Sequence, residues 1–160
     1  VLAMAQGFGM QVKVWTRSPE MHLDQYSVDL FTDIETLLQT SDFISLHLPL
    51  NENTHEILGS DEIHNMKVGA TLINTARGGL VNEPALISAL RSGHLRGAGL
   101  DVFAEEPLAD GHPLLNLDNV ILSPHVAYNT PDAVKAIFEI TVRNICRYFD
   151  GEPINIVAAP

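Results

Sequence analysis

The stretch Leu72–Val81, LINTARGGLV, predicts the centre of the fold. An apolar run over Ala70–Ile73 leads into a polar turn that carries a single arginine, Arg77, followed by two glycines. This pattern is typical of a buried parallel strand that ends in a tight turn, because glycine adopts backbone conformations that other residues avoid. It also fits an ordinary strand-to-helix loop with a solvated arginine. The residues at the ends of the other predicted strands distinguish between the two interpretations.

Apolar runs and helical patterns alternate along the rest of the chain. Strands are expected at Gln11–Thr16, Val28–Phe31, Asp42–Leu48, Ala70–Thr75, Gly97–Val102 and Asn119–Leu122. Helices are expected at Val1–Gly9, Asp33–Leu38, Ser60–Met66, Asn82–Ser92 and Thr130–Asp150, with caps at Asp33, Ser60 and Asn82. Strands that alternate with helices predict βαβ units and a parallel α/β sheet. Because ligands bind outside the carboxyl ends of such strands, the residues that follow each strand form the candidate site.

Composition excludes several classes of function. The 160 residues suit one domain, and 46% hydrophobic with 18% charged residues describes a soluble globular chain. A net charge of −11 argues against nucleic acid, which needs a basic surface, and against anionic membranes. Cys146 is the single cysteine, so no intrachain disulfide forms, which favours a reducing, cytoplasmic location. No transmembrane run, signal peptide or metal-ligand set is identified.

Three reactive side chains fall at predicted strand ends although they lie far apart in sequence: Arg77, Glu106 and His125. They form a complete set for moving a hydride onto a 2-oxo acid. The arginine can bind carboxylate and carbonyl oxygens and stabilise the charge that grows on the carbonyl. The histidine can give that oxygen a proton, and the glutamate can bond the other ring nitrogen and favour the imidazolium. Asp101, at the carboxyl end of another predicted strand, can accept from the nicotinamide carboxamide.

Each of these residues has a structural alternative. His125 could cap the last helix, Glu106 could be a solvated acid in an acidic loop, and Asp101 could cap backbone amides. Five other histidines are interpreted as surface or packing residues: His22, His55, His64, His94 and His112. We favour the site, because three such residues rarely fall at strand ends by accident.

Three segments of the chain resemble the D-isomer-specific 2-hydroxyacid dehydrogenases. ARGGLVNEPALISALRSGHLRGAGLDVFAEEP, from Ala76, resembles the longest signature of that family, LSPHVAYNT, from Leu122, its catalytic-histidine segment, and SDFISLHLPLNENT, from Ser41, its third recurring segment. The resemblance covers nearly the whole chain. It implies a Rossmann-like, doubly wound parallel sheet that binds NAD(P), and reduction of a small 2-oxo acid to the D-2-hydroxy acid.

The resemblance also assigns roles to residues. Arg77, Glu106 and His125 match the catalytic three, and formate dehydrogenases of the same superfamily, which carry Gln at the position of Glu106, are disfavoured. The cofactor-binding positions are expected to be Thr16, Arg17, Ser18, His47, Pro49, Thr54, Thr75, Ala76, Asp101 and Ala127.

The chain also lacks parts that the family carries. The glycine fingerprint GxGxxG and the first strand should lie just before Val1, and Gly7 and Gly9 are not that fingerprint because they follow the helix. We therefore expect a fragment: a partial NAD(P)-binding domain over residues 1–150, a tail over 151–160, and no substrate domain. Since the missing strand is central to the sheet, the chain alone is predicted to fold poorly or to be inactive.

The expected cofactor is NAD(P), with NADP favoured. Thr16 and Arg17 stand where NAD-preferring members place an acid for the ribose 2′-hydroxyl, and an arginine there suits a 2′-phosphate. The alternative is that Arg17 is a solvated turn residue. The expected substrates resemble glyoxylate or hydroxypyruvate, and the full-length protein is expected to be a homodimer. The alternative function is a non-catalytic, dinucleotide-sensing scaffold like the carboxy-terminal-binding corepressors, which keep the same three residues.

Overall fold

The computed structural model describes residues 1–18 and 32–157. The chain divides into two compact units, Val1–Leu122 and Ser123–Pro160. Within the described residues, no helix is both long and apolar enough to cross a membrane.

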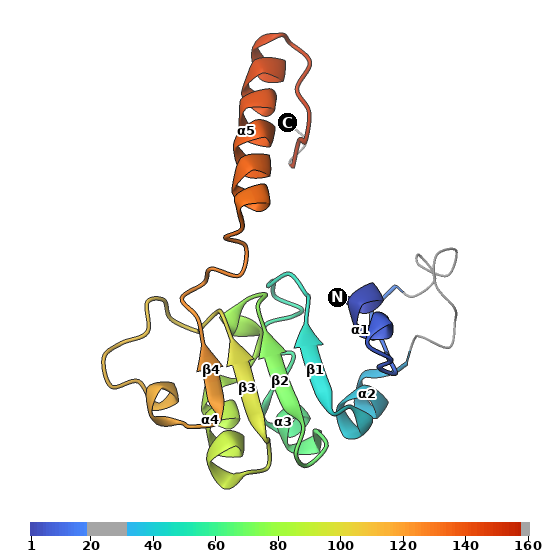
Figure 1. The fold of residues 1–160 in the computed structure, drawn as a ribbon, viewed down its shortest axis with the longest axis vertical. Coiled ribbons are helices and arrows are strands. Elements are labelled where there is room, and N and C mark those ends of the chain that lie inside the picture. Colours follow the sequence, from blue (N-terminus) through green and yellow to red (C-terminus); the bar gives the residue numbers. More distant parts are fainter. Residues whose placement is uncertain (19–31, 158–160) are drawn as a thin grey trace. The chain divides into compact units, whose positions relative to one another are not determined.

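The first unit is built on a four-stranded, all-parallel sheet, in which the strands lie side by side in chain order (Figure 1). They are β1 (Phe43–Leu46), β2 (Thr71–Asn74), β3 (Gly97–Leu100) and β4 (Val120–Leu122). The register places Leu46 opposite Asn74 and Asn74 opposite Leu100, so β1, β2 and β3 end at the same level. The predicted parallel α/β sheet is confirmed for these four strands.

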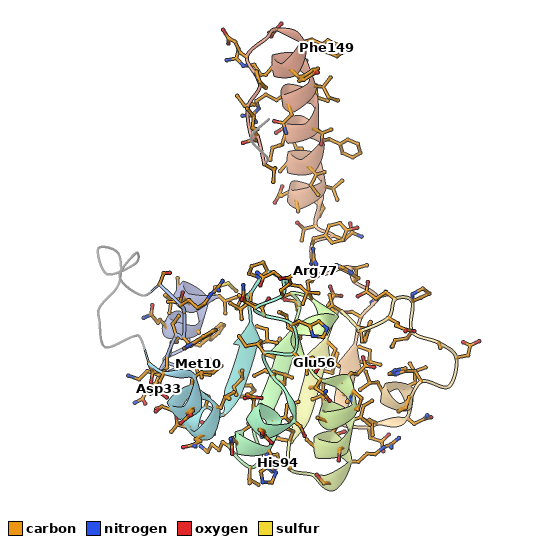
Figure 2. The ribbon with its side chains drawn as sticks, turned by 180° about the vertical axis from the view of Figure 1, so that it is seen from behind. Met10, Asp33, Glu56, Arg77, His94 and Phe149 are labelled. Atoms are coloured by element: carbon orange, nitrogen blue, oxygen red, sulfur yellow. The ribbon has the colours of Figure 1, made fainter. Side chains whose placement is uncertain are left out.

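Helices cover one face of this sheet. α3 (Ser60–Asn65) and α4 (Glu83–Ser92) lie behind the strands in Figure 1 and in front of them in Figure 2, and α3 also packs against α2 (Ile34–Thr40). Side chains alternate along each strand, so Leu72 and Leu100 point to the covered face. On the opposite face, Phe43 and Ile121 are exposed.

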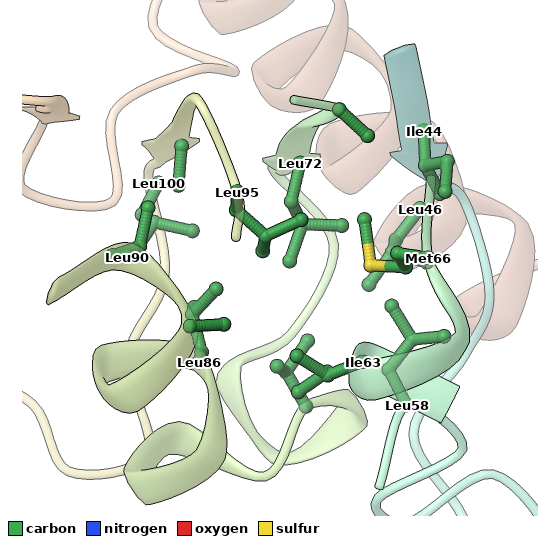
Figure 3. Packing of buried hydrophobic residues seen from close by; sticks show 14 of the residues in the cluster. Ile44, Leu46, Leu58, Ile63, Met66, Leu72, Leu86, Leu90, Leu95 and Leu100 are labelled. Carbon is green, nitrogen blue, oxygen red and sulfur yellow. The ribbon is translucent and has the colours of Figure 1, made fainter. Parts of the chain in front are cut away.

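The hydrophobic core lies between the sheet and these helices (Figure 3). Leu72 from β2, Ile63 from α3, Leu86 from α4 and Leu95, just after α4, are almost completely buried. Burying one such side chain stabilises the fold by about 1.5–3 kcal/mol, before the cost in conformational entropy is counted. This core fixes β2 and β3, and with them the turns that follow.

The predicted helix boundaries hold closely, with one wrong cap. The Asp33 carboxylate accepts from Thr36 N at 2.7 Å, and the Asn82 side chain accepts from Ala85 N at 3.0 Å. Ser60, however, does not cap α3, because Gly59 occupies that position. The Glu62 carboxylate reaches back to accept from the Gly59 N–H at 3.1 Å, which satisfies the helix start without a serine hydroxyl.

The strand predicted over Gln11–Thr16 is wrong. Among the described residues, only Val14 of this stretch makes a strand-like pairing, in which its carbonyl accepts from Thr32 N at 3.0 Å. Alternating side chains favour a strand, but a strand forms only where a neighbour pairs along its length. The strand predicted at Val28–Phe31 lies outside the described residues. α1 (Leu2–Gly7) matches the predicted first helix.

The second unit consists mainly of α5 (Pro131–Phe149), which begins within one residue of the predicted start and is capped by Thr130, whose Oγ accepts from Ala133 N at 3.2 Å. None of its residues is buried. Large apolar side chains of this helix are exposed, including Ile137, Phe138 and Phe149. Between β4 and α5 lies the short segment that carries His125.

Candidate active site

The carboxyl ends of three strands bring polar residues to one edge of the sheet. His47 follows β1, Thr75 follows β2 and Asp101 follows β3, each one residue beyond the aligned strand ends. The backbone N–H of Asp101 donates to the Asn74 carbonyl at 3.0 Å, which carries the pairing to this point. The convergence of strand ends that the sequence predicts is therefore present in the first unit.

Asn74 builds the turn that carries Arg77. Its side chain is 1% exposed, although it is polar. The amide oxygen accepts from Ala76 N at 3.0 Å, and the amide nitrogen donates to the Arg77 carbonyl at 2.9 Å. The sequence pattern identifies Asn74 only as the first residue of the polar turn after the apolar run. An asparagine at the end of a buried strand, one turn before a charged residue, was the available signal.

Arg77 is exposed and lies at the carboxyl edge, at the end of the unit opposite His94 (Figure 2). Its guanidinium donates to the Ala76 carbonyl at 2.6 Å. Gly78 follows, and a Cβ there would lie 1.9 Å from the Phe103 carbonyl oxygen. No side chain fits in that space, so the glycine lets the Arg77 turn touch the loop after β3 directly.

An open hollow of about 480 Å³ lies beside this turn. Its walls come from the segments after β1 and β2: His47, Leu48, Pro49, Leu50, Thr75, Ala76 and Arg77. Four of the predicted cofactor-binding residues therefore line one hollow together with the predicted substrate-binding arginine. His47 Nε2 lies 2.9 Å from the Ser45 hydroxyl, which orients its ring.

Thr54 is hydrogen-bonded to Pro49, one of the residues that line the hollow. It is 3% exposed, and its hydroxyl donates to the Pro49 carbonyl at 2.6 Å and accepts from Asn51 N at 2.9 Å. Both bonds lie within its own loop. The structure thus gives Thr54 a role in shaping the segment that contains Pro49, while its predicted contact with a cofactor stays a prediction.

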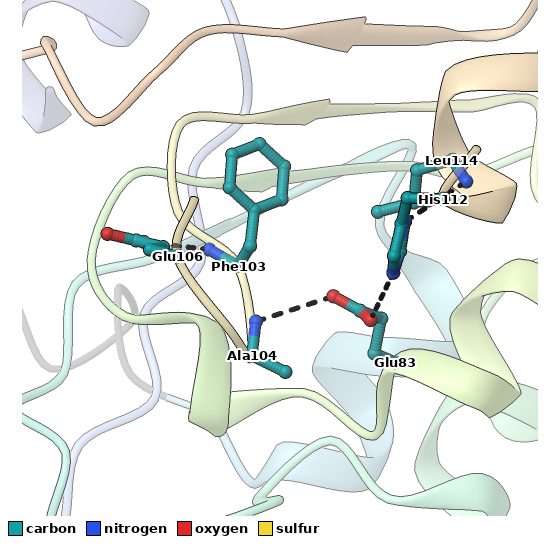
Figure 4. Close-up of polar contacts among 6 residues, drawn as sticks. All are labelled: Glu83, Phe103, Ala104, Glu106, His112 and Leu114. Carbon is teal, nitrogen blue, oxygen red and sulfur yellow. Dashed lines mark hydrogen bonds and ion pairs between the residues drawn. The ribbon is translucent and has the colours of Figure 1, made fainter. Parts of the chain in front are cut away.

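Glu106 lies on the exposed loop between β3 and β4. One of its carboxylate oxygens accepts from Phe103 N at 3.0 Å (Figure 4). Asp101, at the start of this loop, is 2% exposed. The two acids therefore differ in environment: Asp101 is held inside the edge of the sheet, and Glu106 is held on the surface by its own loop.

His125 lies in the second unit, as does Ala127, whereas Arg77 and Glu106 lie in the first. The grouping of the catalytic three thus stays a prediction. The backbone of His125 is left-handed, with φ 54°, and its N–H donates to the Ser123 carbonyl at 3.0 Å. Such a conformation is uncommon outside glycine and gathers at functional sites.

The predicted ribose-binding segment, Thr16 to Ser18, lies in the first unit. Ser18 N donates to the Thr16 hydroxyl at 3.5 Å, and Arg17 is exposed. An electrostatic shift is resolved elsewhere, at the cap of α2. There the backbone N–H of Thr36 lowers the pKa of Asp33 below its usual 3.8 by stabilising the carboxylate.

Known proteins resemble this chain in both sequence and fold. A family model described as "D-isomer specific 2-hydroxyacid dehydrogenase, NAD binding domain" matches residues 1–127. A glyoxylate reductase of Thermococcus litoralis is 42% identical over 154 residues, which cover 96% of this chain and 46% of that protein. A glycerate dehydrogenase of Methylorubrum extorquens is 41% identical, with 97% and 48% covered. The chain thus spans about half the length of these curated relatives.

Solved structures agree with these sequence matches. The TT0316 protein from Thermus thermophilus superposes with a TM-score of 0.90 at 41% identity, covering 99% of this chain and 49% of that one. An acyclic imino acid reductase, Bsp5, solved with NADPH and D-Arg, gives a TM-score of 0.85 at 34% identity, with 98% and 48% covered. The chain belongs to the D-isomer-specific 2-hydroxyacid dehydrogenases and carries their NAD-binding domain.

Proposed function

We propose that the full-length protein reduces a small 2-oxo acid, such as glyoxylate or hydroxypyruvate, to the D-2-hydroxy acid. The observation that carries the proposal is Arg77, an exposed cation on the rim of a hollow at the carboxyl ends of parallel strands. The relatives named above include a glyoxylate reductase and a glycerate dehydrogenase, which supports this class of substrate.

The hollow suits one end of a dinucleotide. It is open, lined by the small residues Thr75 and Ala76 and by Pro49, and it lies where ligands of open α/β sheets bind. Bound NAD(P)H would supply the hydride. The residues that would hold it are the ten named from the sequence, of which His47, Pro49, Thr75 and Ala76 line this hollow together.

The remaining chemistry falls to three side chains of this chain. As carbon 2 of the substrate gains a hydride, the electron pair of its carbonyl double bond moves to oxygen. Arg77 binds the substrate carboxylate and that oxygen, which stabilises the growing negative charge. His125 gives the oxygen a proton, and Glu106 accepts a hydrogen bond from the other ring nitrogen and so favours the imidazolium. In the reverse direction His125 takes the proton back.

Arginine replacement tests the proposal. In the full-length protein, Arg77→Ala should lower kcat/KM for glyoxylate at least about 10²-fold, because a charge-stabilising group is lost. Titration of NADPH fluorescence should show unchanged cofactor binding. Arg96→Ala is the matched control, because Arg96 is an exposed arginine that directly precedes β3, at the opposite end of the strands. Unchanged turnover in Arg77→Ala would reject the assigned role. If the unmodified full-length protein binds the cofactor but reduces no 2-oxo acid, the scaffold function would be favoured.

We infer that NADP is preferred over NAD. The support is Arg17, an exposed cation beside Thr16 where an acid would select the ribose 2′-hydroxyl. Parallel titrations of the full-length protein with NADPH and NADH test this, and tighter binding of NADH would end the preference. A cytoplasmic homodimer is the proposed state, and light scattering of the full-length protein would measure its mass.

A further inference from the structure

A histidine and a glutamate outside the predicted site are linked across the first unit. His112 Nε2 lies 3.1 Å from Glu83 Oε1, and the two side chains are only 19% and 18% exposed. Glu83 stands in the first turn of α4, six residues after Arg77, while His112 stands on the loop after β3, six residues beyond Glu106. The link therefore joins α4, which follows the Arg77 turn in the chain, to the loop that carries Glu106 (Figure 4).

The bonds of His112 fix the direction of this link. Leu114 N donates to His112 Nδ1 at 3.3 Å, so Nδ1 acts as an acceptor. In the neutral ring the proton then lies on Nε2, which donates to the Glu83 carboxylate. One imidazole thus has two structural roles: Nδ1 caps the short helix η4 (Pro113–Asn116), and Nε2 binds the loop to α4.

Glu83 uses its second oxygen on the same loop. Oε2 accepts from Ala104 N at 3.4 Å, next to Phe103, whose own N–H donates to Glu106 at 3.0 Å. Phe103 also touches Gly78 through its carbonyl. Phe103 and Ala104, which are consecutive residues of one turn, thus contact Glu83, Glu106 and Gly78. Moving this turn would move Glu106 relative to Arg77.

We propose that Glu83 and His112 are positioning residues that clamp the loop after β3, so that Glu106 stays in place to orient the catalytic histidine. This inference rests on the function proposed above. Neither residue touches a substrate, and each acts through Glu106. A loop displacement of about 1 Å can cost up to about 10²-fold in rate, so the clamp should affect kcat more than cofactor binding.

Two replacements of His112 separate its two jobs. His112→Asn keeps a short acceptor for the Leu114 N–H but is too short to reach Glu83. His112→Gln keeps a longer donor for Glu83 but gives up the cap of η4. In the full-length protein, we expect His112→Asn to lower kcat about 10- to 100-fold, with KM for NADPH changed less than about twofold. We expect His112→Gln to restore most of kcat.

Hydrogen–deuterium exchange supplies a readout that does not depend on turnover. His112→Asn should speed exchange in peptides around Ala104–Glu106, and His112→Gln should speed it only around Leu114. His94→Gln is the matched control, because His94 bonds the Ile63 carbonyl at the other end of the unit and should change neither measurement. If His112→Asn does not fold, Glu83→Gln replaces it, since a glutamine has one acceptor oxygen where Glu83 uses two.

The results distinguish the two proposals. If the unmodified protein reduces no 2-oxo acid, the proposed function fails, and the exchange data alone judge the clamp. Equal losses of kcat in the Asn and Gln variants would show a role in folding only and would overturn the clamp. So would unchanged exchange around Ala104 in His112→Asn.

Discussion

The turn after β2 and the loop after β3 each carry a proposed catalytic residue, but they are held in different ways. The first is fixed from inside, by the buried Asn74 amide and by backbone bonds such as Leu58 N to the Leu80 carbonyl at 3.0 Å. The second is also tied by side-chain hydrogen bonds from its own length and from α4. The comparison sets a turn supported by a buried side chain beside a loop in which side-chain contacts tie the segment that carries Glu106.

The largest effect is expected where the two segments touch. In Gly78→Ala, the new Cβ would collide with the Phe103 carbonyl, so one segment must move. We expect a loss of about 2 kcal/mol or more in unfolding free energy and about 10²-fold in kcat. Thermal unfolding and steady-state kinetics measure both.

Gly99→Ala is the control for that replacement, because among the described residues no heavy atom beyond its two chain neighbours lies within 4 Å of a Cβ at Gly99. Its stability should stay within about 1 kcal/mol of the unmodified protein. Equal stability of the two variants would show that the contact at Gly78 is loose.

Removing the inner support of the turn should have the next largest effect. Asn74→Ala deprives Ala76 N and the Arg77 carbonyl of their partner, at a cost of about 1–3 kcal/mol. Asn74→Asp keeps the acceptor for Ala76 N, so it separates the two bonds. KM for the 2-oxo acid should rise in Asn74→Ala as the arginine loses its fixed position. An unchanged KM would mean that the backbone bonds hold the turn without Asn74.

The smallest effect on stability is expected at Glu106. Glu106→Gln retains an oxygen that can accept from Phe103 N, so the free energy of unfolding should change by less than about 0.5 kcal/mol. The kcat for reduction should nevertheless fall about tenfold or more, because a neutral amide favours the imidazolium less than a carboxylate does. A stable variant with full activity would remove Glu106 from the proposed mechanism.

The sequence predicted the parts of this site that local patterns determine. An apolar run followed by Arg77 and glycines correctly indicated β2 and its turn, because strand burial and turn chemistry depend on neighbours in sequence. His47, Pro49, Thr75 and Ala76 were predicted as cofactor-binding positions through the family resemblance. In the structure these four residues line the same hollow.

The contacts between distant segments could not be predicted in the same way. His112 was interpreted as a surface or packing residue, and nothing near it in sequence indicates Glu83, 29 residues away. The steric need for Gly78 depends on Phe103, which the sheet brings near only after β3 forms. The strand predicted over Gln11–Thr16 was wrong for a related reason. A strand forms by pairing with another segment, and the sequence of one segment does not show whether that pairing occurs.

The contact between Gly78 and Phe103 also limits how the turn after β2 and the loop after β3 can be redesigned. Because their backbones touch, a change in the length of either one near this point would displace the other. The exposed tip of the second loop, Ala109–Gly111, lies beyond the contact and before His112. Insertions or transplanted specificity segments should therefore be accommodated at that tip, while Phe103–Glu106 must be transferred together with the β2 turn as one module.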